Sequence, residues 1–136
     1  MHLLKQLLFC FFFFAGGCLF AQELTGWTKL KSPTNETLRR LYFVDANNGW
    51  AVSLGGKIIN TTDSGNNWNI QNSTVSTPIV DIFFINPNRG WALTYPSEPP
   101  FGTSILKTTD GGERWVKDSV FFQNEIFSTI FFVDDN

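Results

Sequence analysis

The sequence is poor in the side chains that build disulfide frameworks and metal centres. Among its 136 residues there are two cysteines, Cys10 and Cys18, and one histidine, His2. All three lie in the first 21 residues, which have the pattern of a cleaved export signal. A chain that begins after Ala21 would therefore have no disulfide, no thiolate nucleophile and no cysteine or histidine metal site. We predict no metal and no cofactor.

The export signal is predicted over residues 1–21. Lys5 gives a positive start, residues 7–14 form an apolar core and small residues follow. The apolar run is shorter than the roughly 20 residues that a membrane span needs. We expect a bacterial protein exported to the periplasm or beyond, with no membrane span after cleavage. Lipoprotein anchoring at Cys18 is the alternative, although residues 15–17 lack the larger apolar side chain usual at such sites.

Positive charge is also scarce. The chain has 10 Lys and Arg residues against 12 Asp and Glu, and loss of Lys5 leaves nine against twelve, a net charge near −3. Nucleic-acid binding needs a basic surface that meets the phosphates. The sequence therefore argues against a nucleic-acid partner.

Helical periodicity is missing after the signal, and the composition favours strands. Residues 22–136 are rich in Phe, Trp, Ile, Val, Thr, Asn and Gly. No stretch of them holds a 3.6-residue apolar period, whereas β-branched and aromatic residues suit short strands between tight turns. We predict an all-β fold.

One motif, Ser/Thr-x-Asp-x-Gly-x-x-Trp, occurs twice, at residues 61–68 and 108–115. Its Asp can accept hydrogen bonds from the backbone of a tight turn, and its Gly allows a positive φ. Its Trp can close the turn by packing on the adjacent hairpin. These roles are structural and not catalytic. The residues assigned to them are Thr61, Asp63, Gly65, Trp68, Thr108, Asp110, Gly112 and Trp115.

Other segments recur in register with this motif. Residues 41–45 precede a Gly-Trp-Ala-Val segment, residues 82–86 precede Gly-Trp-Ala-Leu, and a third apolar copy begins at residue 130. Val44 lies 41 residues before Ile85, which lies 48 residues before Val133. Repeats of this length with several short strands are typical of β-propeller blades.

We predict a partial β-propeller made of two four-stranded antiparallel blades and flanking strands. The first blade covers about 38–71 and the second about 79–118, while a third begins at about 127. Residues 26–30 match a fourth strand without a blade of its own. Because propellers have about four to eight blades, we expect residues 22–136 to be the N-terminal part of a longer protein. Further blades would come from later residues or from another chain. The predicted strands are 38–44, 49–54, 57–62, 68–71, 79–85, 90–95, 104–109 and 115–118.

The motif resembles the Asp-box, or BNR repeat, of sialidase-like β-propellers. The order apolar-Phe-apolar-Asp, Gly-Trp-Ala-Val and Thr-Thr-Asp-x-Gly-x-x-Trp also resembles photosystem II assembly factor-like propellers, over residues 26–136. This resemblance implies an exported, non-enzymatic scaffold that binds a protein or a glycan or assists assembly. One fold serves many functions, so the resemblance specifies the fold more closely than the function.

An exported glycoside hydrolase of sialidase-like or xyloglucanase-like type is the alternative. Such enzymes need two carboxyl groups facing one substrate. The Phe/Tyr-Arg-Ile-Pro segment expected ahead of the first box of a sialidase is absent, and Asp45 lies where turn capping is the better explanation. We predict no catalytic residue in this stretch. The candidate catalytic carboxyl groups outside the boxes are Asp45, Asp81, Glu98, Asp118 and Glu125.

Residues that differ between the copies mark a candidate partner-binding rim. Arg40 and Asp81 align at the top of the innermost strands, where we expect them to face water in a central channel, and Arg39 has no charged counterpart. The loop around residues 96–102 is six residues longer than in the first blade, and variable loops on a rigid scaffold often carry recognition. Ion pairing between blades and covering of the blade edge are the alternatives. The predicted rim residues are Arg39, Arg40, Asp81, Phe101, Phe121 and Phe122, with the last two in a loop.

Overall fold

The computed structural model describes residues 29–133, in which all secondary structure is strand. The predicted signal peptide, Cys18 and most of the 26–30 strand lie outside the described residues. Within that described range, no helix is long and apolar enough to cross a membrane. The strands are β1 (Leu38–Phe43), β2 (Gly49–Ser53), β3 (Ile58–Thr61), β4 (Asn69–Gln71), β5 (Ile79–Phe84), β6 (Gly90–Thr94), β7 (Gly102–Thr108) and β8 (Val116–Gln123).

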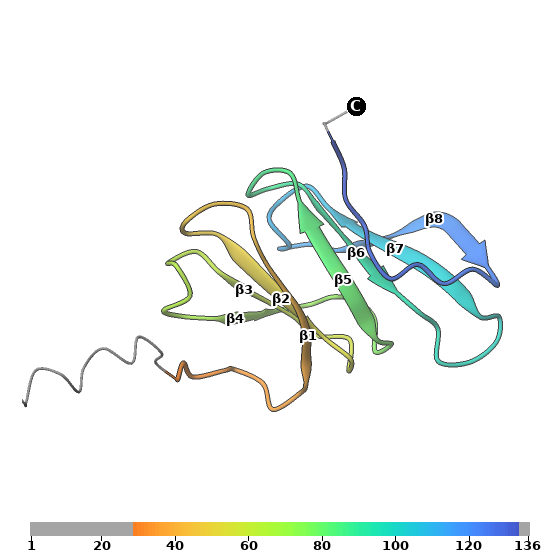
Figure 1. The fold of residues 1–136 in the computed structure, drawn as a ribbon, viewed down its shortest axis with the longest axis horizontal. Helices are drawn as coiled ribbons and strands as arrows, with labels where there is room; N and C mark the ends of the chain where they lie inside the picture. Colours follow the sequence, from red (N-terminus) through yellow and green to blue (C-terminus); the bar gives the residue numbers. More distant parts are fainter. Residues whose placement is uncertain (1–28, 134–136) are drawn as a thin grey trace, which may run out of the picture.

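The strands form two four-stranded antiparallel sheets, each a simple meander. One sheet has the order β1-β2-β3-β4 and the other β5-β6-β7-β8. Figure 1 shows the two sheets side by side, with β1 and β5 next to each other where the sheets meet. The protein is therefore an all-β partial β-propeller, and the two sheets are its first and second blades.

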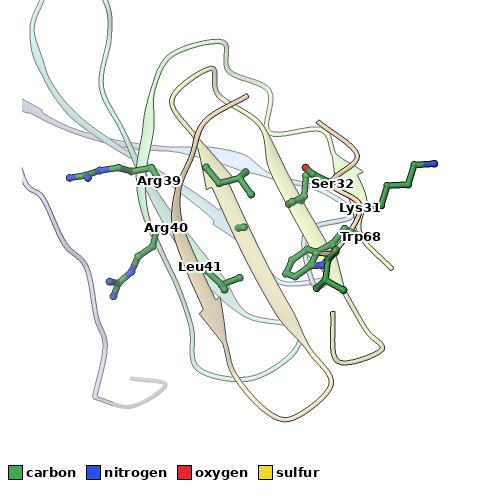
Figure 2. Close-up of a pocket in the computed structure, with 10 residues that line it drawn as sticks. Lys31, Ser32, Arg39, Arg40, Leu41 and Trp68 are labelled. Carbon is green, nitrogen blue, oxygen red and sulfur yellow. The ribbon is translucent and has the colours of Figure 1, made fainter. Parts of the chain in front are cut away.

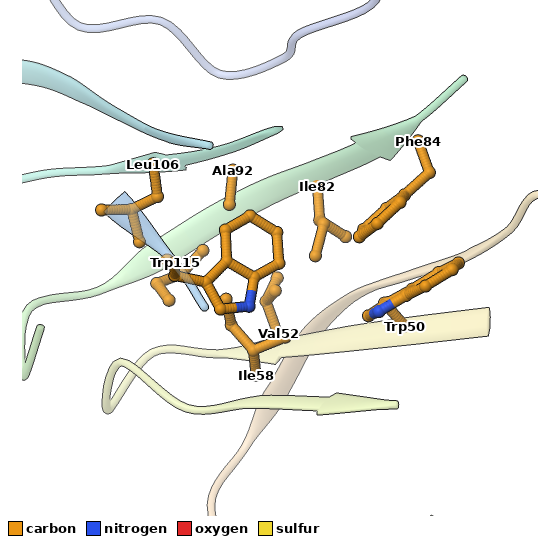
Figure 3. Close-up of a cluster of buried hydrophobic side chains, with 9 residues drawn as sticks. Trp50, Val52, Ile58, Ile82, Phe84, Ala92, Leu106 and Trp115 are labelled. Carbon is orange, nitrogen blue, oxygen red and sulfur yellow. The ribbon is translucent and has the colours of Figure 1, made fainter. Parts of the chain in front are cut away.

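The hydrophobic core lies between the two blades, as Figure 3 shows. The first blade contributes β2 and β3 side chains, and the second contributes side chains from β5, β6, β7 and the second box. At its centre the rings of Trp50 and Phe84 stack with centroids 3.6 Å apart and an angle of 11°. The buried residues of this cluster are Trp50, Val52, Ile58, Ile79, Ile82, Phe84, Ala92, Leu106 and Trp115.

Each innermost strand contains an irregularity near its start. In a regular strand, residues three apart point to opposite faces, yet Ile79 and Ile82 are 0% and 1% exposed in the same core. The pairing of β5 with β6 shifts between Ile79 and Asp81, and that of β1 with β2 shifts between Leu38 and Arg40. A β-bulge thus adds one residue to each strand, and in the first blade that residue is Arg39.

The end of the second blade differs from the sequence prediction. β8 continues to Gln123, five residues beyond the predicted end at Asp118, because β7 begins at Gly102 and pairs with the added residues. Phe121 and Phe122 therefore belong to a strand and not to a loop. Their backbones pair with Ser104 and Thr103.

The third apolar copy packs on the second blade, and its described residues form no strand. Phe132 stacks on Trp91 with centroids 4.0 Å apart, which repeats the Trp50–Phe84 contact one blade further on. Figure 1 shows this last segment, in dark blue, passing over the second blade.

The two box tryptophans are not equivalent in their surroundings. Trp115 is 2% exposed, lies edge-on to Phe84 and donates through Nε1 to Gln71 Oε1 at 3.2 Å. Trp68 is half-buried and lies edge-on to Phe43. The sequence predicts the same role for both, but only Trp115 has a neighbouring blade packed over it in the described residues.

We predict that Trp115→Ala lowers the free energy of unfolding by about 3 to 5 kcal/mol, since it empties a buried aromatic site. The matched change Trp68→Ala should cost clearly less because that ring is already half exposed. Urea denaturation of both variants measures the difference. Equal losses would show that the first blade is covered as fully as the second.

Candidate functional site

The first box is a closed hydrogen-bonded turn. Asp63 Oδ1 accepts from Thr61 Oγ1 at 2.8 Å and from the backbone N–H of Asn67 at 2.8 Å. Thr61 Oγ1 also accepts from the N–H of Gly65 at 3.0 Å, and Gly65 has a φ of +87°. The backbone hydrogen bond from Asn67 is the main cause that lowers the pKa of Asp63. The carboxylate is thus committed to the turn.

The second box repeats this geometry. Asp110 Oδ1 accepts from Thr108 Oγ1 at 2.7 Å and from the N–H of Arg114 at 3.0 Å. Thr108 Oγ1 accepts from the N–H of Gly112, whose φ is +94°. The N–H of Arg114 is the main cause that lowers the pKa of Asp110. A proton donor for catalysis needs a pKa raised toward neutrality. The pKa of Asp63 and that of Asp110 are both lowered instead.

Two of the other candidate carboxylates also have local partners. Asp45 accepts hydrogen bonds from the N–H groups of Asn47 and Asn48. The hydrogen bonds from Asn48 are the main cause that lowers the pKa of Asp45. Asp118 pairs with Lys107 at 3.0 Å. Capping of the turn after β1 is therefore the role that the structure gives to Asp45.

The loops divide between two ends of the blades. The first box contacts the β1–β2 turn, where the N–H of Ser64 donates to Asn47 O at 3.0 Å. At the other end, Ser73 in the β4–β5 loop donates through its hydroxyl to Gly56 O in the β2–β3 hairpin. The variable loops thus share one rim, which carries the starts of β1 and β5.

Asp81 corrects one sequence prediction. Its side chain is 3% exposed and does not face water. Arg40 Nε lies 2.9 Å from Asp81 Oδ1, and the N–H of Ile130 donates to Oδ2 at 2.8 Å. The carboxylate is buried because it joins the inner strand of the first blade to the segment that follows the second. Asp81 is a link between repeats and not part of an open rim.

The two arginines at this rim have different roles. The Arg40 side chain is 53% exposed and is held by Asp81. Arg39 is exposed on the bulge and forms no ion pair within the described residues. Figure 2 shows both side chains extending from β1 toward one side, away from Lys31. Arg39 is therefore an exposed cation whose charge no ion pair within residues 29–133 neutralises.

Tyr95 stands close to the same rim. It begins the long loop after β6, and its hydroxyl donates to Phe127 O. Partial burial raises the pKa of Tyr95, and the positive charge of Arg39 acts against that rise.

Of the three predicted aromatic anchors, Phe101 is the one that is exposed, at 53%. Phe122 is half-buried and lies edge-on to Phe127 at 5.0 Å, and Phe121 is half-buried beneath the Lys117 ammonium. Phe121 and Phe122 therefore cover the blade edge, which was the alternative interpretation.

A groove lies on the face of the first blade that points away from the second blade, and it was not predicted from the sequence. Its volume is about 350 Å³, and its walls are mainly apolar. It runs beside Arg39 and Arg40 at one margin, as Figure 2 shows. The residues that line it are Leu30, Lys31, Ser32, Leu38, Arg39, Arg40, Leu41, Ala51, Ile59 and Trp68.

Comparisons with known proteins agree with this architecture. The structure of YCF48 bound to D1 peptide matches 72% of this chain with 26% sequence identity and a TM-score of 0.59. The structure of YCF48 from Cyanidioschyzon merolae matches 68% with 24% identity and a TM-score of 0.56. In each case the match spans 30% of the YCF48 chain. No family model and no curated protein matches the sequence. YCF48 is a β-propeller protein, so the similarity supports the propeller fold.

We predict that the box carboxylates make the stability of the protein depend on pH. A carboxyl group whose pKa is lowered by folding stabilises the protein above its unfolded pKa, near 3.8, and this contribution is lost as pH falls through the folded value. Asp110→Asn should therefore lower the thermal midpoint at neutral pH and weaken its fall below about pH 4. Glu113→Gln is the control, because this exposed residue of the same loop meets Asp110 through its backbone N–H, which the change leaves in place. An unchanged acid dependence in Asp110→Asn would contradict the role given to Asp110.

Proposed function

We propose that this protein is an exported, non-enzymatic propeller scaffold whose variable-loop rim binds an extended segment of a partner protein. The observation that carries the proposal is Arg39. The bulge in β1 directs this residue outward, and its charge is not neutralised by an ion pair within the described part of the chain. An exposed guanidinium on a rigid strand is a suitable donor to a carboxylate of a partner.

Two other exposed features of the structure fit a protein partner better than a small substrate. The exposed ring of Phe101 lies in the long loop between β6 and β7, and the apolar groove borders β1. Aromatic and Arg side chains are enriched at protein interfaces. A peptide that places a carboxylate on Arg39 could extend apolar residues over either feature.

The similarity to YCF48 supports the same function. One of the YCF48 structures described above contains a bound D1 peptide, so a propeller similar to this chain binds a protein segment. We propose peptide or protein binding, in the manner of an assembly factor, for this chain also. A partner within photosynthesis is not required by any residue described above.

A glycoside hydrolase is not favoured. Asp45, Asp63 and Asp110 accept hydrogen bonds from their own turns, and Asp118 pairs with Lys107. A hydrolase needs two carboxyl groups free to face one substrate. These carboxylates are not free in that sense.

We predict that Arg39→Glu weakens peptide binding by roughly tenfold or more, because it replaces attraction to a carboxylate by repulsion. The probe is the fluorescently labelled D1 peptide, and the readout is its anisotropy as protein is added. The matched control is Arg114→Glu, since Arg114 is exposed in the second box at the opposite end of the blade. Equal affinity of the two variants would overturn the rim assignment.

A further inference from the structure

The outer strands of the two blades differ in length. β4 and β8 are the last strands of their sheets, and among the described strands each contacts only the strand before it. β4 has three residues, whereas β8 has eight and is the longest strand in the described range. Propellers leave short, protected sheet edges at their circumference. A strand as long as β8 therefore requires a protection other than shortness.

Exposed apolar side chains make this protection more important. Val116 and Val120 of β8 are 42% and 48% exposed. A long, exposed, apolar edge strand is a template on which a strand of another chain can pair. Of the two outer strands, β8 is therefore the one at which strand addition is expected.

A bulge interrupts β8 in its middle. The pairing of β8 with β7 shifts there, and residues 118–120 of β8 stand opposite Ile105 alone. A bulge of this kind bends the strand and increases its twist. The pairing of β4 with β3 is regular along its whole length. The longer outer strand is therefore the one whose edge is irregular.

Asp118 caps the backbone inside this bulge. Its Oδ1 accepts a hydrogen bond from the N–H of Val120 at 3.2 Å, and its Oδ2 lies 3.0 Å from Lys107 Nζ. The first contact occupies a backbone donor of a residue that has no partner in β7. The second contact helps to orient the carboxylate, since an ion pair this exposed contributes little to stability by itself.

We propose that Asp118 is an edge-capping residue, which keeps the outer edge of the second blade closed to strands of other chains. The cap on the N–H of Val120 maintains the bulge and prevents β8 from becoming a straight edge. The excluded partner is an extended apolar strand, such as β8 of a second copy. β4 needs no such residue, because three residues offer too few hydrogen bonds to an incoming strand.

This role is independent of the function proposed for the rim, because Asp118 lies outside the residues assigned there to partner binding. It also gives a purpose to a carboxylate that the sequence offered as a catalytic candidate. The role concerns association between chains, so it is measured by aggregation and not by peptide binding.

The first test follows aggregation of the full chain with agitation, by thioflavin T fluorescence and sedimentation velocity. Asp118→Ala frees the N–H of Val120, so its lag should shorten by roughly threefold or more relative to wild type. Asp118→Asn retains an oxygen acceptor for that N–H and should keep a lag near that of wild type. A lag in Asp118→Ala equal to that of wild type overturns the proposal. A lag in Asp118→Asn as short as that in Asp118→Ala also overturns it.

A second pair of variants separates strand addition at β8 from aggregation through unfolding. Val120→Lys, added to Asp118→Ala, places a charge on the β8 edge and should return the lag close to that of wild type, because lysine opposes strand addition. Ile70→Lys in the same background is the matched control, since Ile70 is 51% exposed but lies on β4. Recovery with Val120→Lys alone supports the edge-capping role. Equal recovery in both double variants, or none with Val120→Lys, contradicts it.

Discussion

The contact on which this structure depends is the stack of a β2 tryptophan on a phenylalanine of the next repeat. Trp50 lies on Phe84 at 3.6 Å and Trp91 on Phe132 at 4.0 Å. A single four-stranded sheet cannot bury its own apolar side chains, so neighbouring blades must cover each other. The boxes support this arrangement from the outer strands, where the ring of Trp115 meets Phe84.

Sequence reasoning predicted the architecture because the repeat is expressed in residues with local roles. The Asp and Gly of each box determine a turn without help from distant residues, as the hydrogen bonds of Asp63 and the positive φ of Gly65 show. Strand ends were predicted less well, since β8 extends beyond Asp118 only because β7 starts early. That pairing depends on a long-range contact and not on composition.

The candidate site shows where sequence reasoning fails. Asp81 was assigned to an open channel because it is a charged residue in an apolar strand, but its partner Arg40 lies 41 positions away and buries it. The groove was missed because its residues resemble a core. The spacing of apolar residues was a usable signal, because Leu38 and Leu41 are three apart, as are Ile79 and Ile82. Two residues three apart lie on one face of a strand when a bulge adds a residue between them. In β1 that added residue is Arg39.

The stacked Trp–Phe pair holds adjacent repeats together. A double-mutant cycle measures this most directly, using the free energies of unfolding of Trp50→Leu, Phe84→Leu and the double variant. We predict a coupling energy of about 0.5 to 1.5 kcal/mol in favour of the native pair. Additive losses, with no coupling between Trp50 and Phe84, would contradict the account.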